Sequence, residues 1–147
     1  MREILFRGKY SKKSPDWIEG SFHKDEDANI CEIAYRYYKK QGETKAGIWV
    51  YGVVDPETVG QYTGLIDKNG KKIFEGDICE ITTFTYDDED IQLVGKVCFK
   101  YSSFVFQGLK HPDDEVLFSS VCDFDTDVEV IGNIYDNPEL IGVEANG

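Results

Sequence analysis

Residues 61–74 read QYTGLIDKNGKKIF, two short strand-like segments on either side of an Asn-Gly pair. Asn-Gly is the pair best suited to the positive φ angles of a two-residue type I′ turn. The sequence therefore predicts a hairpin with its tip at Asn69 and Gly70 and with arms over residues 61–66 and 71–74.

The region after this hairpin continues as short strands. A bend at Glu75-Gly76-Asp77 precedes an alternating apolar segment over residues 78–84, an order that is typical of small SH3-like barrels at the level of fold analogy only. Further strands, separated by polar turns, are expected over residues 91–101, 103–109, 115–121 and 128–135. Because proline cannot donate to a ladder, Asp136-Asn137-Pro138 is expected to end the last strand. We expect an SH3-like, partly open barrel over residues 61–141 and a flexible tail over residues 142–147.

The first 60 residues also favour strands, which predicts a mainly β protein with an N-terminal lobe of short strands over residues 1–60. Strands are expected over residues 3–10, 17–22 and 47–54. Residues 29–38 fit both an amphipathic helix and an alternating strand. Their tyrosines and isoleucines favour a pleated, half-buried surface, so a strand is predicted there.

Composition and charge narrow the class of protein. With 147 residues, 41% hydrophobic and 14% aromatic, the chain can bury a core and is expected to fold. No apolar run approaches the ~20 residues that span a bilayer, and charges interrupt the N-terminus before a signal-peptide core forms, so we expect a cytoplasmic protein with no membrane partner. The formal charge of −12 disfavours direct nucleic-acid binding.

No group of residues predicts chemistry. The four cysteines lack Cys-x-x-Cys spacing and a nearby histidine, so we expect reduced thiols that pack as small hydrophobes. His23 and His111 are expected in polar loops, and Glu75 and Asp77 are expected to be exposed or to cap backbone amides. No phosphate-binding glycine motif is present. We therefore expect no enzyme, no catalytic residue, no cofactor and no metal.

Aromatic side chains are dense in the N-terminal lobe. They are Tyr35, Tyr37, Tyr38, Trp49 and Tyr51. Their number exceeds what one small sheet normally buries, so some can form an exposed surface that binds a protein or a second copy of the chain. The simpler interpretation, which we favour, is that they fill the core of the lobe. The open edge strands of a small β protein also permit pairing between copies, which would give a homo-oligomer.

Three segments resemble the YopX family of phage and prophage proteins. The longest is residues 55–78, DPETVGQYTGLIDKNGKKIFEGDI, followed by residues 129–140, EVIGNIYDNPEL, and by residues 2–8, REILFRG. The resemblance implies a β-rich protein found in bacteriophages and prophages, mostly of Gram-positive bacteria. It implies no biochemical activity and no catalytic residues.

Two functions follow as hypotheses. The first is a non-enzymatic protein-interaction module that acts on a host or phage protein. The alternative is an acidic DNA mimic that inhibits a host nucleic-acid-binding protein, and clustering of the acidic residues on one face would favour it. Those residues are Asp87, Asp88, Glu89, Asp90, Asp113, Asp114, Glu115, Asp123, Asp125 and Asp127.

Overall fold

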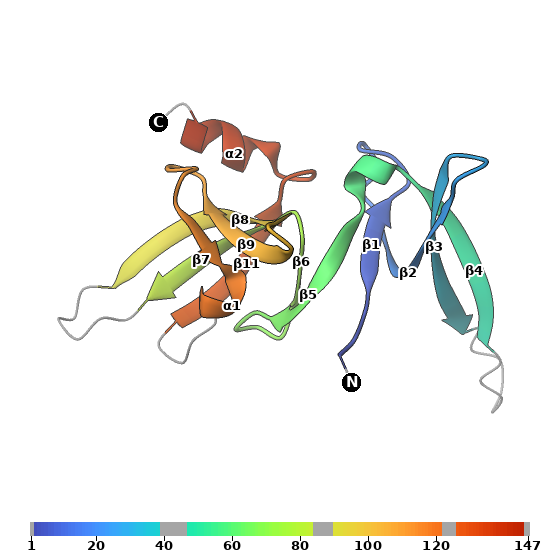
Figure 1. Cartoon of the computed structure of the whole chain (residues 1–147), viewed down its shortest axis with the longest axis horizontal. Coiled ribbons are helices and arrows are strands. Elements are labelled where there is room, and N and C mark those ends of the chain that lie inside the picture. The colour runs from blue at the N-terminus through green and yellow to red at the C-terminus, as the bar shows by residue number, and fades with distance from the viewer. Residues whose placement is uncertain (1, 39–46, 84–89, 122–125, 146–147) are drawn as a thin grey trace. The chain divides into compact units, whose positions relative to one another are not determined.

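The computed structural model describes residues 2–38, 47–83, 90–121 and 126–145 (Figure 1). The chain divides into two compact units, Met1–Gln61 and Tyr62–Gly147, and the sequence analysis placed the boundary between residues 60 and 61. Each unit is built on antiparallel strands, so the mainly β prediction is confirmed.

The first unit contains a sheet with the order β4-β3-β2-β1, continued by the start of β5. The strands are β1 (Phe6–Lys9), β2 (Trp17–Asp25), β3 (Ile30–Tyr38), β4 (Gly47–Val54) and β5 (Gly60–Ile66). The strand predicted over residues 29–38 is confirmed as β3. A short 3₁₀ helix, η1 (Pro56–Thr58), separates β4 from β5.

The core of the first unit lies on one face of this sheet. Ile33 is opposite Gly52 on β4, and Cys31 is opposite Val54, so these positions share a face. The buried side chains are Ile18, Cys31, Ile33 and Val54, with Phe6, Tyr35 and Val59 packed against them. Tyr35 therefore packs against the core. The simpler interpretation, that the aromatic residues fill the core, is correct for this residue.

β5 passes from the first unit into the second. Gly60 and Gln61 pair with β1, and the next residues pair with β6 (Lys72–Phe74) to form the predicted hairpin. The Asp67 N–H donates to the Lys71 carbonyl at 2.8 Å and the Gly70 N–H donates to the Asp67 carbonyl at 3.0 Å, which closes a loop of three residues, not two. Only Gly70 of the predicted pair has a positive φ, 81°. The hairpin is confirmed, but the type I′ turn is wrong.

The second unit contains a five-stranded sheet with the order β10-β9-β8-β7-β11. Its strands are β7 (Asp77–Thr83), β8 (Ile91–Lys100), β9 (Ser103–Gly108), β10 (Glu115–Leu117) and β11 (Thr126–Asn133). The sheet is not closed into a barrel. Its buried core consists of Ile73, Cys79, Ile81, Val97, Phe106, Phe118 and Val128.

Two short helices in the second unit were not predicted. The strand expected to reach residue 121 ends at Leu117, and α1 (Phe118–Val121) follows, with the Phe118 side chain fully buried. α2 (Pro138–Ala145) occupies most of the expected tail, so a tail beginning at residue 142 is wrong for residues 142–145. Proline ends strands, but it also suits the first turn of a helix because its amide needs no partner there.

Candidate interaction surface

β4 forms an edge of the first unit's sheet, and apolar side chains line it. Trp49, Tyr51 and Val53 alternate along β4 on the face opposite the core, with 55%, 62% and 54% of their surface exposed. We call these three residues the β4 row. Tyr51 lies opposite Ala34 on β3, whose small side chain leaves the ring uncovered.

Arg36 supports the beginning of the β4 row. It lies opposite Trp49 on β3, its guanidinium carbon is 5.4 Å from the Trp49 ring centroid, and its Nη2 donates to the Gly47 carbonyl at 3.0 Å. A guanidinium stacked on an indole limits the movement of both side chains. Trp49 is therefore presented in a defined position on the surface.

The five predicted aromatic residues do not form one patch. Tyr35 and Tyr37 lie on the core face of β3, although Tyr37 is exposed and pairs there with the exposed Ile48. Trp49 and Tyr51 lie on the other face. Tyr38 ends β3 opposite Gly47, and its side chain is outside the described part of the structure. Val53 also belongs to the β4 row, but it was not predicted because it is not aromatic.

β4 also lacks the features that protect sheet edges. Its sequence, GIWVYGVV, contains no charge and no proline. Natural edge strands commonly carry lysine or proline, or are very short, because unpaired backbone groups attract other strands. A partner strand can therefore add to β4 through backbone hydrogen bonds while the β4 row supplies side-chain contacts.

Two buried carboxylates, that of the predicted Asp77 and that of Asp67, accept hydrogen bonds from backbone amides. The Asp77 carboxylate is buried and accepts the Phe74 N–H at 2.8 Å. The Asp67 carboxylate accepts the N–H groups of Asn69, Lys71 and Val130 at 2.9, 2.8 and 3.1 Å. Burial opposes ionisation of Asp67, but these donors hold the pKa of its carboxyl below the usual value.

The other candidates do not assemble a reactive centre in the part of the chain that is described. Cys31 and Cys79 are buried free thiols, burial raises the pKa of the partly buried Cys98, and Cys122 lies outside the described residues. His23 lies in β2, not in a loop, and is exposed. The described residues contain no group of three or more potential metal ligands.

Two of the three segments that suggested a family, residues 55–78 and 129–140, meet within the second unit. The Asp67 carboxylate binds the Val130 amide, and the Lys68 N–H donates to the Val128 carbonyl at 2.9 Å. The Ile134 N–H donates to the Gly76 carbonyl, also at 2.9 Å, and Gly76 has a φ of 91°. These motifs join the hairpin to β11 and stabilise the fold.

The fold and this surface define a mainly β protein of two units in which β4 is an apolar edge strand among the described residues. The chain belongs to the YopX family, described as YopX protein, which matches residues 5–142. It is also similar to the crystal structure of protein EF1440 from Enterococcus faecalis, with 23% identity and a TM-score of 0.55 over 96% of this chain and 99% of that chain. No curated protein matches the chain significantly. No helix of the described residues is long and apolar enough to cross a membrane.

Proposed function

We propose that this protein is a non-enzymatic interaction module that binds an extended segment of a host or phage protein by strand addition along β4. The observation that carries the proposal is the β4 row, an uncharged edge strand with three exposed apolar side chains on one face. The family resemblance suggests a phage or prophage setting, and we place the action in the bacterial cytoplasm.

The charge distribution supports an apolar recognition mode at β4. The first unit contains ten Lys and Arg and ten Asp and Glu, whereas the second contains six and eighteen, so the formal charge of −12 belongs to the second unit. A neutral unit neither attracts nor repels a partner over long distances. Backbone pairing and the aromatic side chains of the β4 row would therefore provide most of the affinity.

The test is capture of partners from nuclease-treated host lysate with three versions of the full chain. Tyr51→Lys places a protective charge on the edge, while Ile4→Lys makes the same change at a side chain that is equally exposed, 62%, and lies outside β4. We expect a stoichiometric protein partner with the wild type and Ile4→Lys and its loss with Tyr51→Lys. A partner retained equally by all three would contradict the proposal. Size-exclusion chromatography of the same variants shows whether the partner is a second copy.

One observation favours the DNA-mimic alternative, namely that the second unit carries all the net negative charge. Of the ten acidic residues named for this hypothesis, only Asp90, Asp113, Asp114, Glu115 and Asp127 are described. This alternative predicts that duplex DNA and moderate salt displace the partner and that Tyr51→Lys has no effect. The capture experiment thus separates the two functions.

A further inference from the structure

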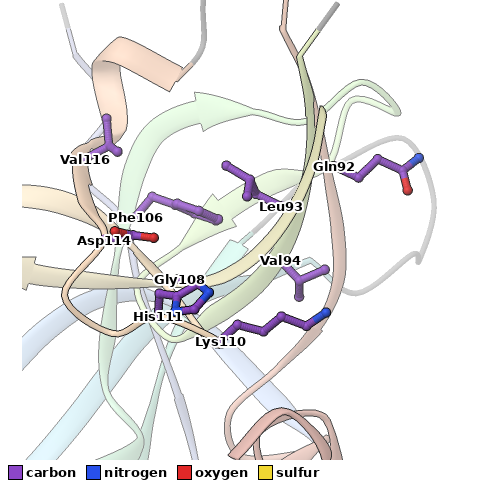
Figure 2. Close-up of a pocket in the computed structure, with 9 residues that line it drawn as sticks. All are labelled: Gln92, Leu93, Val94, Phe106, Gly108, Lys110, His111, Asp114 and Val116. Atoms are coloured by element: carbon purple, nitrogen blue, oxygen red, sulfur yellow. The ribbon is translucent and has the colours of Figure 1, made fainter. Parts of the chain in front are cut away.

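The second unit contains a pocket of about 290 Å³ beside the connection between β9 and β10 (Figure 2). Side chains from three strands and from this connection line it. The lining residues include Leu93, Phe106, Lys110, His111, Asp114 and Val116. The volume equals that of about ten water molecules at ~30 Å³ each, and it lies just below the ~300–1,000 Å³ range of ligand sites. The pocket therefore suits a small molecule.

The middle of the pocket is apolar. Leu93 and Val116 remain 51% and 44% exposed, whereas Phe106 is 3% exposed and provides a fixed wall. Gly95 on β8 permits this placement, because a Cβ there would collide with the Phe106 ring. Burial of the exposed parts of Leu93 and Val116 by an aliphatic or aromatic group would be favourable.

The polar rim of the pocket has an ordered backbone. The Gly108 N–H donates to the Asp114 carbonyl at 3.0 Å, and the Asp114 N–H donates to the His111 carbonyl at 2.8 Å. The Gln107 side chain donates to the Pro112 carbonyl at 3.0 Å. These bonds place the rim side chains before a ligand arrives, which reduces the entropy lost on binding.

Two opposite charges lie on this rim without neutralising each other. Neither the Lys110 ammonium nor the Asp114 carboxylate makes a hydrogen bond or an ion pair with any described residue. In the view of Figure 2 the His111 imidazole lies between the Asp114 carboxylate and the Lys110 side chain, so a carboxylate, an imidazole and a cation line the pocket together with the apolar residues. The charges of Lys110 and Asp114 are both available to a ligand.

We propose that this pocket binds a small apolar α-amino acid as a zwitterion. The side chain would contact Leu93, Phe106 and Val116, the ligand ammonium would pair with Asp114, and its carboxylate would pair with Lys110 beside His111. A simple anion is disfavoured by the eighteen acidic residues of the second unit, and a simple cation leaves Lys110 without a partner. A zwitterion satisfies both charges and adds no net charge.

The test follows backbone amide shifts of the full chain by NMR during titration with L-phenylalanine, phenethylamine and 3-phenylpropionate, up to about 20 mM. The two analogues lack the carboxylate and the amine, respectively. We expect L-phenylalanine to shift the amides of Gly108, Leu109 and Asp114 saturably. Each analogue should bind roughly tenfold more weakly, because one charge-assisted contact is lost.

Two matched variants assign the contacts. Asp114→Asn should make phenylalanine and 3-phenylpropionate bind equally, whereas Asp113→Asn, the same charge change at a neighbour outside the pocket, should preserve the difference. Neither Asp side chain has a partner among the described residues, so both variants should fold. Absence of a saturable shift with phenylalanine, or equal affinity of the wild type for all three compounds, would overturn the proposal.

Discussion

The two units use antiparallel sheets in different ways. The first unit has no net charge, holds both tryptophans and leaves β4 open at its edge. The second unit carries the whole net charge, and polar side chains such as Asp67 bind backbone amides across its motifs. Close packing at glycines in the first unit and charge-assisted hydrogen bonds in the second can therefore be tested by different substitutions.

The largest expected effect tests close packing in the first unit. A Cβ at Gly20 on β2 would overlap the Ala34 carbonyl oxygen, a backbone atom that cannot move without breaking the β2–β3 pairing. We expect Gly20→Ala to lower the free energy of unfolding by about 3 kcal/mol. Tryptophan fluorescence during urea denaturation reports this unit, because Trp17 and Trp49 both belong to it.

Gly52→Ala is the matched control for this prediction. A Cβ at Gly52 would meet Ile18 Cδ1 at 2.5 Å, but that methyl group ends a flexible side chain and can rotate away. The expected loss is about 1 kcal/mol. Equal losses for the two variants would show that backbone contact does not determine the stability of this unit.

The next effect concerns the charged hydrogen bonds of the second unit. Asp67→Asn retains one carbonyl oxygen but turns an amide donor toward another N–H, so one of the three backbone donors loses its acceptor. We expect a loss of about 2 kcal/mol. Hydrogen exchange should accelerate at the Val130 amide, while the fluorescence transition of the first unit stays in place; a shift of that transition would contradict independent stabilisation of the units.

Low pH should reduce the contribution of the Asp67 hydrogen bonds to the stability of the second unit. The pKa of Asp67 is lower in the folded protein than its usual value of 3.8, so the folded state binds fewer protons than the unfolded state. The contribution of Asp67 is therefore fully present above pH 3.8 and is lost as the pH falls through the lowered pKa. Asp67→Asn should remove this part of the pH dependence, and unchanged acid sensitivity would count against it.

The sequence predicted the strands well because their signals are local. The tyrosines and isoleucines of residues 29–38 placed β3 correctly where the periodicity fitted both a helix and a strand, and Asn69-Gly70 placed the hairpin. The loop type was missed because the Asp67 side chain, through its bonds to Asn69, Lys71 and Val130, favours a loop of three residues. A long-range acceptor of this kind leaves no local pattern in the sequence.

Helix α1, the β4 row and the pocket were not predicted for the same reason: they depend on contacts between residues far apart in the sequence. Burial of Phe118 ends β10 and favours a helical turn, but burial depends on the completed core. The aromatic residues were grouped by type, whereas strand register separates Tyr35 from the β4 row. His111 was expected in a polar loop, and it lies in the connection between β9 and β10, but only the folded chain brings it into one pocket with Asp114 and Phe106.

The smallest expected effect tests whether a partly buried ion pair contributes to the stability of the second unit. Lys100 Nζ donates to Glu115 Oε1 at 2.6 Å, and this bond lowers the pKa of Glu115 and raises that of Lys100. In a double-mutant cycle of Lys100→Gln and Glu115→Gln, we expect a weak favourable coupling that disappears in about 1 M salt, where the screening length is about 3 Å. Glu115→Gln alone should change stability little, because removing one of eighteen acidic residues also reduces repulsion. A coupling that persists in high salt would mean that the pair is shielded from water, and that hydrogen bonds to charged groups stabilise this unit at its surface as well as at Asp67.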